Sequence, residues 1–133
     1  MSFANAEQAG DLNVIAVGWN ANVDIVSVAD SSGNSYNVAA PTITGNGKSQ
    51  AIYYATQVSA GPDVVTVTFS GPANYVDLRL AEYAGVSTLD AAGSATGTTG
   101  TAAASVTTSA HSPACMIGPT RAALALLIVQ SFA

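Results

Sequence analysis

Two runs of alternating hydrophobic and polar residues occupy the middle of the chain, at residues 64–69 and 75–83. Both are rich in β-branched and aromatic residues, and a period of two is typical of β-strands. Residues 70–74, Ser-Gly-Pro-Ala-Asn, lie between the runs and favour a turn. We therefore expect two antiparallel strands that pair with each other.

The same pattern extends along the chain. Residues 12–19 are apolar on both faces, which predicts a central strand. A hairpin is expected around the loop 30–34, and residues 41–49 are expected to form a long Gly-, Asn- and Pro-rich loop. The apolar stretch 122–132 fits a buried strand or a short helix, and the all-β context favours a strand. The strands expected outside the middle pair are 12–19, 23–29, 35–39, 50–58, 89–92, 105–108 and 122–132.

Strands at regular spacing with turn signals between them predict one all-β domain, residues 1–133. The expected architecture is an antiparallel β-sandwich of the jelly-roll or immunoglobulin-like type.

Composition narrows the classes of function. Of the 133 residues, 49% are hydrophobic and 8% charged, and the net charge is −5. An acidic chain with three basic residues is unsuited to nucleic acid or to an anionic membrane surface. The single cysteine excludes an intrachain disulfide. No signal peptide is expected at the start, and the apolar run 122–129 is too short to span a bilayer as a helix.

Residues 9–109 resemble a known kind of domain. The stretches that carry the resemblance are AGDLNVIAVGWN, VADSSGNSYNVA, SQAIYYATQV, VTVTFSGPANYVDLRLAEYAGV and SVTTSA. In this order they resemble a repeated β-sandwich domain of large secreted bacterial surface proteins of the adhesin type. Residues 110–133 depart from that pattern as an atypical apolar tail on a truncated domain. The resemblance implies a non-catalytic extracellular or cell-surface module for adhesion, spacing or carbohydrate contact, without a cofactor.

The candidate ligand site lies on one face of the run 75–83. By the period of two, Asp77 and Arg79 share a face with Tyr75 and Tyr83. Aromatic rings beside a carboxylate and a guanidinium are suited to stacking on a saccharide and hydrogen bonding to it. The alternative is a solvated sheet face with one ion pair.

A competing hypothesis is a small hydrolase of esters or phosphoesters, with its site on the sheet face or at a subunit interface. Its candidate acids or bases are Asp77 and Glu82, and the period of two places Glu82 on the opposite face of the run 75–83. Its candidate nucleophile pair is His111 with Cys115. Pro113 argues against a helix that would place that pair on one face, and incidental tail residues are the alternative.

The loop 30–34 raises a weak alternative of calcium binding by Asp30 and Asn34. It lacks the regular series of ligands that calcium loops use, and turn chemistry explains both residues, so no metal is expected.

The run 122–129 carries no charge that would protect a strand edge. It must fold back as a strand of its own domain or be buried against a second copy. We expect a homo-oligomer, most simply a dimer, formed through residues 122–130.

Overall fold

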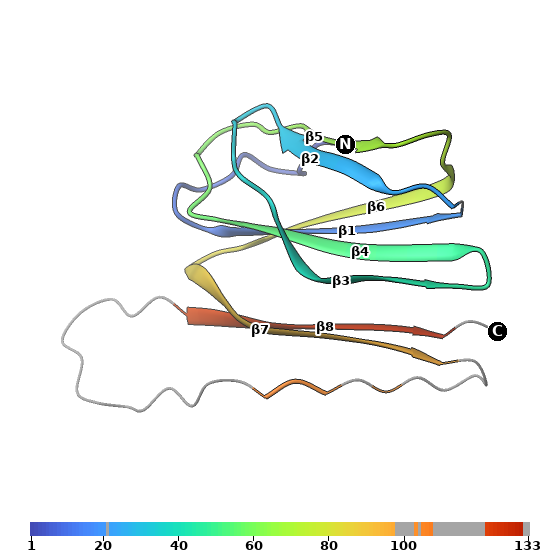
Figure 1. Ribbon diagram of the computed structural model, residues 1–133. Helices are drawn as coiled ribbons and strands as arrows, with labels where there is room; N and C mark the ends of the chain where they lie inside the picture. Colours follow the sequence, from blue (N-terminus) through green and yellow to red (C-terminus); the bar gives the residue numbers. More distant parts are fainter. Residues whose placement is uncertain (21, 98–102, 104, 108–121, 132–133) are drawn as a thin grey trace.

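The computed structural model describes residues 1–20, 22–97, 103, 105–107 and 122–131 (Figure 1). Its regular structure consists of strands, and no described residue lies in a helix. The strands are β1 (Leu12–Asn20), β2 (Ile25–Asp30), β3 (Asn37–Gly45), β4 (Lys48–Thr56), β5 (Val65–Phe69), β6 (Asn74–Tyr83), β7 (Val86–Gly97) and β8 (Ala122–Ser131). The all-β prediction is confirmed. Among the described residues there is no helix long and apolar enough to cross a membrane.

Four strands form an antiparallel sheet in the order β3-β4-β1-β6. The prediction that residues 12–19 form a central strand is confirmed, because β1 has neighbours on both sides and is buried on both faces. Leu12 and Val14 belong to the core on one face, whereas Ile15, Val17 and Trp19 belong to the core on the other.

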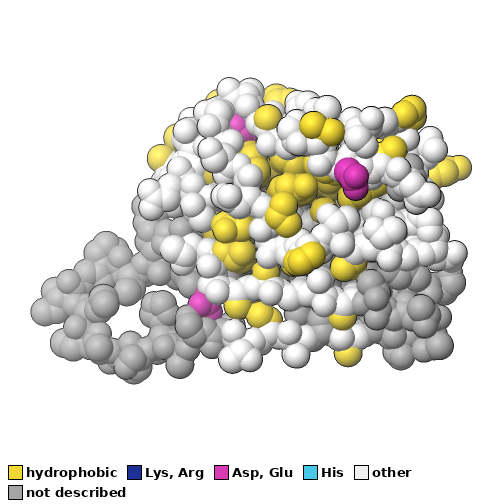
Figure 2. Space-filling view, viewed as in Figure 1, with side chains coloured by type: hydrophobic (Ala, Val, Ile, Leu, Met, Phe, Trp, Pro, Cys, Tyr) yellow, Lys and Arg dark blue, Asp and Glu magenta, His cyan; other side chains and the backbone are white. Residues whose placement is uncertain are grey.

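The antiparallel pair β2–β5 covers the Trp19 face of the sheet. Val65 and Phe69 of β5 pack there, and the rings of Trp19 and Phe69 meet with centroids 5.5 Å apart. The indole nitrogen of Trp19 donates to the carbonyl of Val23 at 2.9 Å, so its polar atom has a partner. Figure 2 shows apolar side chains exposed on one side of the molecule, in keeping with sheets that do not close on themselves.

Strand β7 covers part of the opposite face, where Val86 and Ala92 pack against Leu12 and its neighbours. Residues 122–131 form strand β8, so the strand expectation for this stretch is confirmed. Strand β8 pairs with β7 in a parallel arrangement, from Val86↔Ala122 to Gly97↔Ser131. Parallel pairing needs a long return connection, and the sequence between the two strands provides one.

The expected pairing of the two middle strands is wrong. Both strands form, but β5 pairs with β2 and β6 pairs with β1. The link between them is bound to the segment before β2: Ser70 N donates to Asp24 O at 2.9 Å, and Asp24 N donates to Ser70 Oγ at 3.0 Å. These bonds direct the chain from one layer into the other instead of through a hairpin.

The expected hairpin around residues 30–34 and the loop at 41–49 are also wrong. Strand β3 pairs with β4 and continues through Gly45. A two-residue turn, Asn46-Gly47, follows with φ values of 50° and 72°, which suit a tight hairpin. Pro41 is accommodated because β3 lies at the sheet edge, beside irregular pairing between Ala40 and Ile43. Of the strand expected at 105–108, residues 105–107 are outside any strand and residue 108 lies outside the described residues.

Residues 1–11, called the N-terminal arm below, run beside the β5 end of the molecule. Bridges join Ser2 to Val64 and Glu7 to Gly61. The amide of Gly10 donates to the carbonyl of Val58 at 2.9 Å. The arm therefore covers the part of the Trp19 face that β2–β5 leaves open, and it carries Glu7 into the interior.

Candidate functional site

The exposed ion pair of β6 lies on the sheet face that β7 covers only in part. Arg79 Nε donates to Asp77 Oδ2 at 3.0 Å, and their side chains are 79% and 60% exposed. Asp77 is opposite Gly18 in β1, and Arg79 is opposite Ala16. Paired residues of an antiparallel sheet share a face, so two small residues flank the ion pair.

Gly18 leaves a shallow gap on this face. Its other neighbour across the sheet is Gln50 of β4. Asp77 and Gln50 are thus separated by two strand spacings, roughly 10 Å. A Cβ added at Gly18 would meet only the Cβ of Asp77, at 4.0 Å. The gap therefore has a carboxylate on one side and an amide on the other.

The two tyrosines differ in their relation to the ion pair. Alternation runs unbroken from Asp77 to Tyr83, which is partly exposed opposite Leu12. The pairing with β1 is irregular between Asn74 and Asp77, and Tyr75 has a φ of 50°. This conformation is uncommon for a bulky residue and is typical of a bulge. Tyr75 is 86% exposed, and the bulge interrupts the period that relates it to Asp77.

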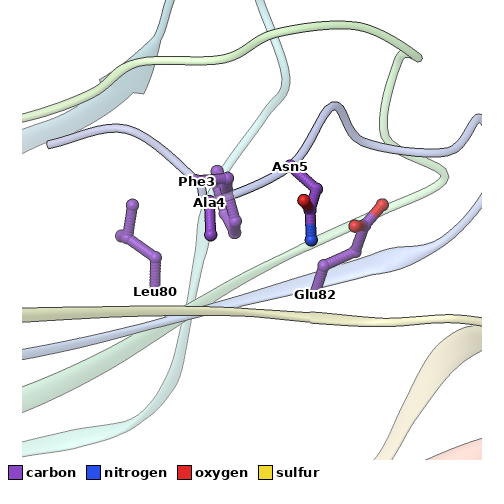
Figure 3. A pocket seen from close by; sticks show the side chains of 5 residues that line it. All are labelled: Phe3, Ala4, Asn5, Leu80 and Glu82. Carbon is purple, nitrogen blue, oxygen red and sulfur yellow. The ribbon is translucent and has the colours of Figure 1, made fainter.

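Glu82 lies on the opposite face of β6, as the period of two predicts. It shares that face with Leu80 and is opposite Asn13 of β1. The backbone amide of Gln8 in the arm donates to Glu82 Oε1 at 2.6 Å. Glu82 also lines a cavity between the arm and β6 (Figure 3).

A buried polar network connects the arm to the sheet. Asn13 Nδ2 donates to Glu7 Oε1 and to the Tyr36 hydroxyl. The Tyr36 hydroxyl in turn donates to Asp30 Oδ2 at 2.8 Å. Glu7 is 1% exposed and Asn13 is fully buried, yet Glu7 Oε2 and Asn13 Oδ1 have no hydrogen-bond partner. Two buried acceptors without a donor are costly, and a proton on Glu7 would supply the missing donor.

Burial raises the pKa of Glu7, the hydrogen bond from Asn13 lowers it, and the charges of Asp63, Glu82 and Asp30 add to the increase, so that the pKa is raised from 4.5 to about 7. Burial also raises the pKa of Tyr36.

Asp63 behaves in the opposite way. Burial acts to raise its pKa, but hydrogen bonds from the Ser31 hydroxyl and from the amides of Val64 and Ser32 outweigh burial and lower it. Glu7 and Asp63 are thus two buried carboxyl groups that prefer different protonation states.

Asp30 and Asn34 form a closed turn. The Asn34 amide donates to Asp30 Oδ1 at 2.9 Å, and Asn34 Nδ2 donates to Oδ2 at 2.8 Å. Asn34 Oδ1 accepts the amide of Ser59 at 2.9 Å, which ties the turn to the end of β4. In the described part of the chain, no three His, Cys, Asp or Glu side chains gather as metal ligands.

His111 and Cys115 lie outside the described residues. Within them, the structure separates Asp77 and Glu82 onto opposite faces of β6.

Sequence reasoning missed Glu7, Asn13, Tyr36, Asp63 and Gln50. One signal was present, since Asn13 interrupts an otherwise apolar central strand. A buried amide in such a strand needs a polar partner. No family model, curated protein or solved structure matches this chain.

Proposed function

We propose that this protein is a non-catalytic module of the β-sandwich type that contacts carbohydrate through the exposed face of β6, beside Gly18 of β1. The observation that carries this proposal is the exposed Asp77–Arg79 ion pair beside the gap at Gly18. The location that fits this role is extracellular or cell-surface, within a larger surface protein of the kind that the sequence resembles.

Saccharide hydroxyls both donate and accept hydrogen bonds, so a site for them needs both kinds of group. Asp77 supplies acceptors, Arg79 supplies donors, and Gln50 across the gap supplies both. The roughly 10 Å between β6 and β4 is wide enough for one sugar ring to lie over Gly18. Tyr83 lies on the same face but six residues further along β6 than Asp77, roughly 20 Å away, so its ring would stack only on a further unit of a longer saccharide.

The proposal is tested by a glycan array followed by calorimetry with the strongest glycan. Arg79→Ala should weaken binding at least tenfold with little change in melting temperature. Gly18→Val should have the same effect, because its side chain would fill the gap. Gly18 does not have positive φ, and valine is favoured in strands, so this variant should fold at least as stably.

Thr66→Val is the matched control, since Thr66 is exposed on β5 in a different layer. It should leave affinity within twofold of wild type. Absence of glycan binding, or Gly18→Val binding as tightly as wild type, would contradict the proposal. Turnover of activated esters or phosphoesters that survives repurification and is lost in Glu82→Gln or Asp77→Asn would favour the hydrolase alternative.

A further inference from the structure

A cavity of about 220 Å³ lies between the arm and the face of β6 that points away from the ion pair. Figure 3 shows Phe3, Ala4 and Asn5 extending from the arm toward the sheet, with Leu80 and Glu82 rising from β6 to meet them. Phe3, Ala4 and Leu80 form an apolar end, and the Asn5 amide and Glu82 carboxylate form a polar end. The cavity is smaller than the roughly 300–1,000 Å³ of drug-sized sites, so it suits a short ligand.

The charges around the polar end are negative. Glu82 and Asp63 lie close enough to Glu7 to raise its pKa. The two basic side chains among the described residues lie elsewhere. Arg79 is paired with Asp77 on the other face of β6, and Lys48 is opposite Asn20 at the far end of β1 from Asn13. The amino group of Met1 donates to the carbonyl of Val65 at 2.8 Å.

Glu82 retains capacity to bind a ligand. The Gln8 amide engages Oε1, while no hydrogen bond within the described residues engages Oε2. A cation at this position would gain a charge-assisted hydrogen bond from Glu82, and the Asn5 side chain could accept a second one. A neutral alcohol of the same shape would gain less, and an anion would be repelled.

We propose that this cavity binds a small organic cation, an ammonium or guanidinium group carried on a short aliphatic stem. The stem would lie between Phe3 and Leu80, and the cationic group would lie between Asn5 and Glu82. The same chemistry is offered by a free alkylamine and by the side chain of a lysine in a partner. This site is independent of the proposed carbohydrate site, since the two lie on opposite faces of β6.

The test is a titration of the isotopically labelled protein with butylamine, 1-butanol and butyrate, followed by amide NMR shifts. Butylamine should shift the amides of residues 3–5, 80 and 82, and should bind at least tenfold more tightly than 1-butanol. Glu82→Gln should reduce butylamine affinity at least tenfold. Glutamine keeps an oxygen for the Gln8 amide, so the arm should remain in place and 1-butanol affinity should be unchanged.

Asp24→Asn is the matched control, because it removes one exposed carboxylate from the segment before β2, which does not line the cavity, and it should change butylamine affinity less than twofold. Equal affinities for butylamine and 1-butanol, or a Glu82→Gln variant that binds butylamine normally, would overturn the proposal. Ala4→Phe, which fills the cavity, must also abolish binding if the site is correct. A terminally blocked lysine that binds more tightly than butylamine would assign the site to a partner's side chain, and weaker binding would assign it to a free amine.

Discussion

Replacement of Glu7 by glutamine should stabilise this protein at neutral and alkaline pH. Glu7 is enclosed, and its Oε1 accepts a hydrogen bond from Asn13. Its Oε2 and the Asn13 Oδ1 both lack a donor. A protonated Glu7 or a glutamine at position 7 has a hydrogen-bond donor beside the Asn13 amide, which already donates to this side chain. An ionised Glu7 has no such donor. Glutamine thus reproduces the protonated state at every pH.

The magnitude follows from the shift of the Glu7 pKa, which is raised from 4.5 to about 7 in the folded protein. Between these values the folded state retains a proton that the unfolded state has released, so stability falls as pH rises. At 1.36 kcal/mol per pKa unit, the wild type loses about 3 kcal/mol of stability over this window. Above pH 7 both states are ionised at Glu7, and this loss stays constant.

The assay is urea denaturation followed by the fluorescence of the buried Trp19, measured from pH 4 to pH 9 for wild type and Glu7→Gln. The two proteins should be about equally stable near pH 4. At pH 8 the variant should be more stable by about 2–3 kcal/mol. Asp77→Asn, which neutralises an exposed carboxylate, should retain the wild-type pH dependence.

The titration of Asp63, whose pKa shifts in the direction opposite to that of Glu7, does not reverse this result. The pKa of Asp63 is lowered from 3.8, so its stabilising contribution is lost below that range and is complete through the window that concerns Glu7. A Glu7→Gln variant that is less stable than wild type at pH 8, or that keeps the wild-type slope between pH 4.5 and 7, would refute the reasoning. Either result would mean that the carboxylate has a donor in the folded protein.

Three further predictions concern packing and assembly. Phe69→Ala should cost about 2–3 kcal/mol in urea denaturation, below the roughly 3–5 kcal/mol of a fully buried phenylalanine because Phe69 is half-buried beside Trp19; a loss under about 1 kcal/mol would contradict the packing of β5. Tyr36→Phe should cost about 1–3 kcal/mol in the same assay, because the part-buried Asp30 carboxylate loses one of its donors and keeps only those of Asn34; an unchanged value would show that water replaces the hydroxyl. Leu126→Asp with Ile128→Asp should convert the expected dimer into a monomer or an insoluble chain, as measured by sedimentation; a wild type that is monomeric at high micromolar concentration would show that β8 only completes its own sheet.

The sequence predicted the strands better than their partners. Apolar residues at successive positions identified β1 as a central strand, because a strand that is buried on both faces has no face of polar residues. The alternation of apolar and polar residues located β5 and β6, because it depends only on neighbouring residues of the sequence. It could not show that the link after Phe69 passes between layers, since that depends on hydrogen bonds between Ser70 and Asp24, which are 46 residues apart.

The sequence likewise predicted those features of the candidate sites that depend on one strand, and missed those that depend on distant segments. The shared face of Asp77 and Arg79 followed from the period of two, and so did the opposite placement of Glu82. The cavity did not follow, because its walls come from the arm and from β6, more than 70 residues away. The bulge at Tyr75 was also hidden, since glycine or asparagine would usually mark a positive φ.

The central position of β1 has a consequence for how the chain is synthesised. It is the first strand to be translated, but its neighbours β4 and β6 lie at residues 48–56 and 74–83. At about 5–20 residues per second, the edge of this strand that pairs with β6 waits roughly 3–13 s after the last residue of β1 is made, and the face that β7 covers waits longer. During that interval the nascent chain carries a strand with an open edge, with Ile15 on one face and Val14 on the other. Such a segment is a natural target for a ribosome-associated holdase, and slowing translation between residues 20 and 83 should lower the soluble yield in cells that lack one.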